Sequence, residues 1–95
     1  AEGATSPIRL LAAPDERLPP VVETAAYLVV AEAAKGGAVT VNAERSGGVL
    51  VVDIDATGRP ARLVDLEDRV GALDGTLTVQ PDTDGVRIRA EIPCG

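Results

Sequence analysis

The sequence predicts an α+β fold, in which two helices cover one face of a mixed, mostly antiparallel sheet to form a two-layer α/β sandwich. Two observations lead to this prediction. The expected elements follow the order strand, helix, two strands, helix, two strands, and both strand pairs are joined by short segments rich in glycine or aspartate. The chain has 95 residues, a length that suits one hydrophobic core, so we expect a single domain over residues 1–95.

The first half of the chain begins with a short apolar run at residues 8–13, which lies between two prolines and predicts an edge strand. Pro19-Pro20 then opens a helix, because proline tolerates the first helical turn. We expect that helix to reach about Lys35 and to stop at Gly36-Gly37. Its apolar residues recur at helical spacing: Val22, Ala25, Val29 and Ala33.

An antiparallel hairpin follows, because the apolar period changes to two at Val39. The turn is expected at Ser46-Gly47-Gly48. Asp53 and Asp55 alternate with apolar residues on the returning strand and should point away from its covered face. The covered face should carry Val39, Val41, Ala43, Leu50, Val52 and Ile54.

The second half starts with a loop at 57–62, since this segment contains Gly58 and Pro60 and has no apolar period. A second helix should follow and should be ended by Gly75. Two further alternating strands are expected around residues 77–79 and 86–92, joined by a turn at 81–85. The stripe of the second helix consists of Leu63, Leu66, Val70 and Leu73.

Composition excludes several classes of function. The formal net charge of −6, without any cluster of Lys and Arg, argues against nucleic acid or an anionic membrane as partner. The chain has no histidine, which excludes histidine-based triads, histidine metal sites and a phosphoacceptor histidine, and we expect no metal site built from the protein alone. The lone Cys94 permits no internal disulfide and fits a reducing cytoplasm. Because the chain lacks methionine and any membrane-spanning run, we expect a cytoplasmic fragment of a longer protein that could be membrane-anchored.

Four segments carry a family resemblance: Leu18-Pro19-Pro20, AAYLVVAEA at 25–33, LEDRVGAL at 66–73 and RIRAEIP at 87–93. Together with the order of elements, they resemble the ATP-binding domain of sensor histidine kinases, which are GHKL-type ATPases, and especially the subgroup common in actinobacteria. The resemblance extends from about Ile8 to Pro93. It implies a C-terminal kinase fragment whose family uses ATP and Mg²⁺.

The family's first helix carries a catalytic glutamate and, four residues later, an asparagine that holds Mg²⁺. Glu32 matches the glutamate, but Gly36 stands in place of the asparagine. Mg²⁺ usually relies on one or two protein oxygens in addition to phosphates, so the loss of this ligand is expected to weaken its binding. Alternatively, Glu32 is an ordinary solvated residue near a helix end.

The family's nucleotide-binding strand ends in an aspartate that accepts the adenine amino group, followed by two glycines. The resemblance assigns these roles to Asp55 and Gly58, whereas Arg59 and Pro60 stand near the second glycine position. A side chain there obstructs the close approach of backbone to nucleotide. Asp55 could equally be an ordinary acidic strand end.

The family's second glycine-rich segment cradles phosphate at the start of the second helix. Arg62 and Asp65 occupy its glycine positions here, and the lid between the two segments is short. Val86 replaces a hydroxyl residue that the family often has at the start of the last strand. These departures predict a degenerate domain that binds Mg-ATP poorly and acts through a dimerisation domain, a partner sensor kinase or a response regulator. Two alternatives stay open: an active catalytic domain that phosphorylates a histidine elsewhere in the parent protein, and a stand-alone relative such as an anti-sigma-factor kinase.

Overall fold

The computed structural model describes residues 8–12, 17–35, 37–58, 63–82 and 85–94. The predicted fold class and the order of its elements are confirmed, with five strands and two helices in the described part of the chain. These elements are β1 (Ile8–Ala12), α1 (Pro20–Ala34), β2 (Val39–Ser46), β3 (Val49–Ala56), α2 (Leu63–Gly71), β4 (Thr76–Asp82) and β5 (Gly85–Pro93).

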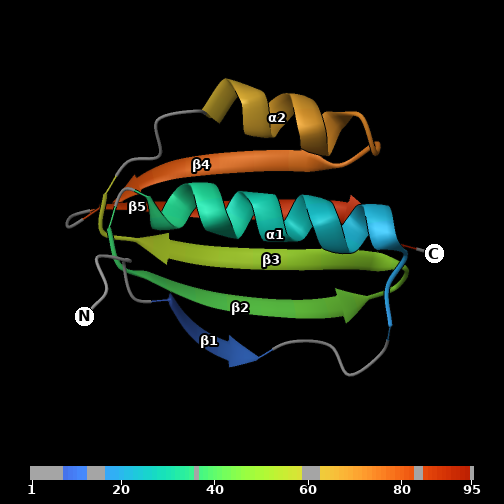
Figure 1. Cartoon of the computed structure of the whole chain (residues 1–95), viewed down its shortest axis with the longest axis horizontal. Helices are drawn as coiled ribbons and strands as arrows, with labels where there is room; N and C mark the ends of the chain where they lie inside the picture. Colours follow the sequence, from blue (N-terminus) through green and yellow to red (C-terminus); the bar gives the residue numbers. More distant parts are fainter. Residues whose placement is uncertain (1–7, 13–16, 36, 59–62, 83–84, 95) are drawn as a thin grey trace.

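The strands form one mixed sheet in the order β1-β2-β3-β5-β4. β1 pairs with β2 in parallel, and the other three pairs are antiparallel. Both helices lie over the same face of the sheet, α1 against β2, β3 and β5 and α2 against β4 and β5 (Figure 1). The opposite face has no helix from the described residues, and we call it the open face.

The core lies between the helices and the sheet and is aliphatic. Most of the side chains that the sequence assigned to it are buried, whereas Ala43, Leu63 and Leu73 are partly buried and pack against it. In the described residues no polar or charged side chain is buried. The buried members of the predicted set are Val22, Ala25, Val29, Ala33, Val39, Val41, Leu50, Val52, Ile54, Leu66, Val70, Val86 and Ile88.

The turn between β2 and β3 has the predicted form. Gly47 and Gly48 have φ angles of 56° and 79°, in the left-handed region that two-residue hairpin turns require. This turn fixes the register of β2 with β3. The register decides on which face of the sheet each residue of β3 lies.

The end of α2 differs from the prediction. The helix ends at Gly71, and the left-handed residue that follows it is Asp74, with φ at 62°, rather than Gly75. Aspartate tolerates this conformation better than most residues. Glycine is needed at 75 for another reason, because a Cβ there would lie 2.6 Å from the backbone oxygen of Glu91.

The turn between β4 and β5 is shorter than the sequence suggested. Pro81 and Asp82 belong to β4, and Gly85 already belongs to β5. Proline is acceptable at this position because β4 is an edge strand of the sheet. Neither α1 nor α2 is long and apolar enough to span a bilayer.

Candidate functional site

A groove lies between α1 and α2. The two helices lie side by side in opposite directions on the sheet (Figure 1). Its two halves meet at Leu28 and Arg69, whose side chains line both. The half beside the start of α1 has a volume of about 350 Å³ and is mostly apolar. The half beside the end of α1 has about 160 Å³ and is charged, and it contains Glu32, Lys35 and Asp65.

Glu32, the candidate catalytic residue, faces this charged half from the last turn of α1. Its side chain is 13% exposed, and its Oε1 accepts a 3.2 Å hydrogen bond from Nζ of Lys35, three residues later. The carboxylate is therefore partly covered and already paired. Glu32 lies on the helix-covered side of the sheet, as a nucleotide site between the helices would require.

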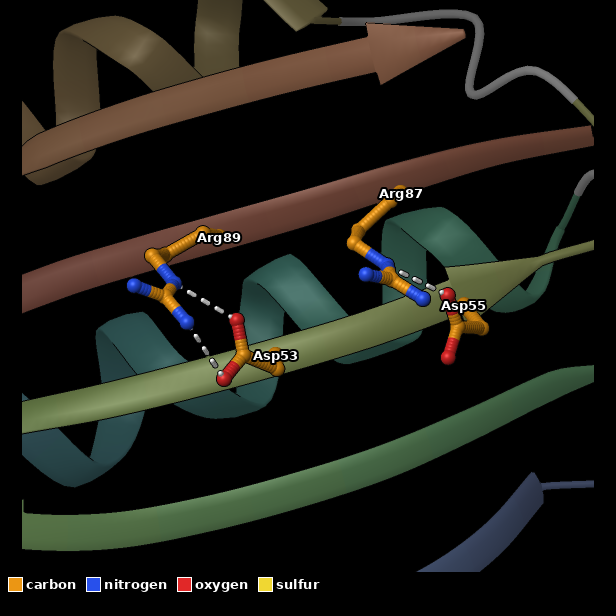
Figure 2. Close-up of polar contacts among 4 residues, drawn as sticks. All are labelled: Asp53, Asp55, Arg87 and Arg89. Atoms are coloured by element: carbon orange, nitrogen blue, oxygen red, sulfur yellow. Dashed lines mark hydrogen bonds and ion pairs between the residues drawn. The ribbon is translucent and has the colours of Figure 1, made fainter. Parts of the chain in front are cut away.

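Asp55, the candidate adenine ligand, lies on the open face, away from both helices. The burial pattern of β3 alternates strictly in this region, and the side chain of Asp55 is 57% exposed. Its Oδ1 accepts a 2.9 Å hydrogen bond from Nε of Arg87 on β5 (Figure 2). The structure therefore does not bring Asp55 and Glu32 together.

A second ion pair lies beside the first on the open face (Figure 2). Arg89 donates from Nε to Oδ1 of Asp53 at 2.7 Å and from its terminal nitrogen to Oδ2 at 3.2 Å. These hydrogen bonds, together with the attraction of the Asp53 charge, raise the pKa of Arg89 above its ordinary value. Cross-strand pairs of opposite charge of this kind stabilise the pairing of β3 with β5. The sheet thus accounts for both acidic residues of β3.

The last residue of β3 on the helix side is Ala56, and it is only 6% exposed. Its methyl group has no hydrogen-bonding atom. Beyond it, Thr57 donates its backbone N–H to the Ala38 oxygen at 3.0 Å, which holds this end of β3 against the segment that follows α1. Gly58 lies beside Gly37 in the same region, its backbone nitrogen 3.5 Å from where a Cβ on Gly37 would be. Gly58 is therefore near the end of α1, whereas Asp55 is on the other face.

The remaining predicted departures are only partly within the described residues. Gly36, Arg59, Pro60 and Arg62 lie outside them. Asp65 is in the first turn of α2 and lines the charged half of the groove, and Val86 is a buried core residue.

Sequence reasoning did not assign Lys35 or Arg69 to the site, although both line the groove. A signal was available for Arg69. It follows Asp65 by four residues on α2, a spacing that places two side chains on the same helix face. In the described part of the chain, no three Asp, Glu or Cys side chains gather as metal ligands would.

Solved structures of histidine kinases have the same architecture. The chain matches the histidine kinase AdeS of Acinetobacter baumannii with a TM-score of 0.66 and 11% identity, over 95% of this chain and 56% of that one. It matches the ATP-binding domain of PrrB from Mycobacterium tuberculosis with a TM-score of 0.59 and 15% identity, over 93% and 81% of the two chains. The chain has the fold of a histidine kinase ATP-binding domain.

The same fold occurs in a blue-light activated histidine kinase of Erythrobacter litoralis, with a TM-score of 0.67 and 19% identity, over 98% of this chain and 36% of that one. The chain thus spans 56% of the AdeS chain and 36% of the blue-light kinase. No family model and no curated protein matches the sequence. The histidine kinase ATP-binding fold is therefore shown by similarity of structure and not by similarity of sequence.

Proposed function

We propose that this chain is a degenerate histidine kinase ATP-binding domain, which does not hold Mg-ATP effectively and acts by binding another protein. The observation that carries the proposal is the position of Ala56. At the end of β3, the residue on the face covered by the helices is Ala56, which presents a methyl group, although the resemblance implies an adenine-binding carboxylate at this strand end. The nearby carboxylate of Asp55 lies on the open face and is paired with Arg87.

The charges in the groove also fit Mg-ATP poorly. Asp65 places a negative charge in the first turn of α2, where the family's fold uses a helix N-terminus and its positive dipole to attract phosphate. A carboxylate at that position repels phosphate. Glu32, the remaining acidic residue of that half, is engaged by Lys35. This half of the groove is therefore poorly suited to hold the phosphates of ATP.

Protein interaction is the function that remains for such a domain. In this proposal the chain is the C-terminal part of a longer sensor kinase in the cytoplasm. It packs against a dimerisation domain or a partner sensor kinase, or it presents a surface to a response regulator. The histidine kinases with the same fold support this class of partner.

Calorimetric titration with ATP, with and without Mg²⁺, tests the proposal. A charge-assisted contact contributes about 1.5 to 3 kcal/mol, so the loss of two of them weakens a micromolar site by roughly two to four powers of ten. We expect no saturable binding of ATP below about millimolar concentration and no effect of Mg²⁺. The ATP-binding domain of PrrB, titrated in the same buffer, is the positive control.

Micromolar, magnesium-dependent binding would refute the proposal and support the alternative of an active catalytic domain. In that alternative, Glu32, Asp55 and Gly58 hold the nucleotide, and the histidine that is phosphorylated lies elsewhere in the parent protein. Asp55→Ala then distinguishes two routes. It would abolish binding if the strand end rearranges to bring this carboxylate to the nucleotide, and it would leave binding unchanged if other groups hold the base.

A further inference from the structure

We propose that the groove between α1 and α2 binds an amphipathic helix of a partner protein, whose apolar side chains fill the apolar half and whose acidic residue pairs with Arg69. This inference rests on the proposed function, because it identifies the surface through which the domain would bind its partner. It concerns a part of the groove that the nucleotide resemblance leaves without a role.

The apolar half of the groove is built from the Pro20–Leu28 part of α1, the end of α2 and the two residues that follow α2. Among the described residues, its polar lining consists only of Thr24 and Arg69, and its apolar lining consists of Pro20, Val21, Ala25, Leu28, Ala72 and Leu73. Val21 is among the most exposed large apolar side chains of the described residues. Exposed apolar surface of this kind, next to polar groups, is typical of interaction sites.

Arg69 supplies the charge that identifies the occupant. It lies at the junction of the two halves, in the last turn of α2. Among the residues that the structure describes, its guanidinium has no hydrogen bond or ion pair, whereas Glu32 and Lys35 in the same groove pair with each other. Asp65, the other charged residue of the groove, also has a polar partner. Among the described residues, Arg69 is thus the one charged residue of the groove without a hydrogen bond or ion pair, and it lies beside the apolar half, where it can pair with an acidic residue next to apolar ones.

The shape of the groove favours a helix as occupant. Val21 and Leu28 are seven residues apart on α1, which corresponds to about 10 Å along the helix at 1.5 Å per residue. A partner helix can place apolar side chains at positions i, i+3 or i+4, and i+7 along this length, as in other complexes where a helix lies in an apolar groove. An anionic membrane is a poorer occupant, because the chain carries a net charge of −6.

Two synthetic peptides of about 16 residues, long enough to form helices, test the proposal with the full chain. The first has three leucines along one face and a glutamate at the end of that face, and the second has a lysine in place of the glutamate. Binding is measured by ¹⁵N NMR titration up to about 1 mM peptide. We expect the glutamate peptide to bind and to shift the backbone amides of Val21, Leu28 and Ala72.

Charge reversal provides the decisive comparison. Arg69→Glu should weaken binding of the glutamate peptide by about ten-fold, which corresponds to a surface ion pair replaced by repulsion, and should allow the lysine peptide to bind. The matched control is Arg9→Glu, which makes the same change of charge on the exposed strand β1. Val21→Glu should also weaken binding, whereas Tyr27→Glu, at another exposed position of α1, should not.

Three outcomes would overturn the proposal: no saturable binding of the glutamate peptide, equal binding to the Arg69→Glu variant, or shifts located outside the groove. Shifts of the groove residues that depend on protein concentration without peptide would show instead that a second copy fills the groove, and would also overturn it. The proposed function is tested separately, by the ATP titration. If the chain bound neither ATP nor the peptide, only the proposal that the groove binds a helix would be refuted.

Discussion

Substitution of Leu66 by alanine measures how strongly α2 is held on the sheet. Leu66 is 3% exposed, and it and Val70 are the two buried residues of this helix. The change removes three carbon atoms, which are worth about 0.8 kcal/mol each, or about 2.4 kcal/mol of transfer free energy. A residual cavity of about 50 Å³ adds roughly 1.2 kcal/mol at 24 cal/mol per Å³. We therefore expect the free energy of unfolding to fall by about 3.5 kcal/mol.

This loss is large for a domain of 95 residues, whose total stability is expected to be about 5 to 14 kcal/mol. The core has no aromatic side chain that could move into the cavity, because Tyr27 is the only aromatic residue and is exposed. Urea denaturation followed by far-ultraviolet circular dichroism measures the change. The matched control is Val64→Ala on the same helix, where the side chain is 68% exposed and the expected change is below about 0.5 kcal/mol. A change below about 1 kcal/mol for Leu66→Ala would show that α2 contributes little to the core.

Three further predictions follow from the backbone, the open face and the C-terminal end. Gly71→Ala should stabilise the domain by up to about 1 kcal/mol, since nothing lies within 4 Å of the added Cβ in this helical position. Gly75→Ala should destabilise the domain, because the added Cβ would clash with β5. Thermal melts that rank the two variants the other way would refute this. The Asp53–Arg89 pair should show a favourable coupling in a double-mutant cycle of Asp53→Asn and Arg89→Gln, which should decrease in high salt because the pair is at the surface; a coupling that salt leaves unchanged would argue against it. Cys94 is buried, so its thiol should react slowly with Ellman's reagent in the native state and at the rate of a free thiol in urea; fast reaction in native buffer would show that the C-terminal end is open.

Most of the fold could be predicted from local patterns in the sequence. Apolar spacing located both helices and β2 to β5, and an apolar run between two prolines located β1. The alternation in β3 correctly placed Asp53 and Asp55 on the side away from the core. The order of strands could not be predicted in this way. β3 pairs with β5, and the contact between Asp53 and Arg89 joins residues 36 positions apart, so it depends on how the whole sheet assembles. The end of α2 was also not predicted correctly, because Asp74 and not Gly75 adopts the left-handed conformation after this helix.

The candidate site was harder to predict because two kinds of inference pointed in different directions. The resemblance assigned Asp55 to a nucleotide, while the period of two required it to face away from the helices. Successive side chains of any strand point to opposite faces of the sheet, and this alternation decides on which face the Asp55 side chain lies. Arg69 was missed because its importance depends on α1, which comes much earlier in the sequence and forms the other wall of the groove.

The central position of β3 also limits how an acidic side chain could be gained on the helix side of the sheet, by evolution or by design. Sliding β3 by one residue would move every side chain of the strand to the opposite face, so that Asp53 would enter the core and Ile54 would leave it. The strand is paired on both sides, with β2 and β5, so the slide would also break the hydrogen bonds to both neighbouring strands. Direct replacement of Ala56 is the simpler route, and it would put a carboxylate where only 6% of the residue is exposed. Such a charge is unfavourable without a partner, so the new acidic residue would become tolerable only together with a ligand or a cation that accompanies it.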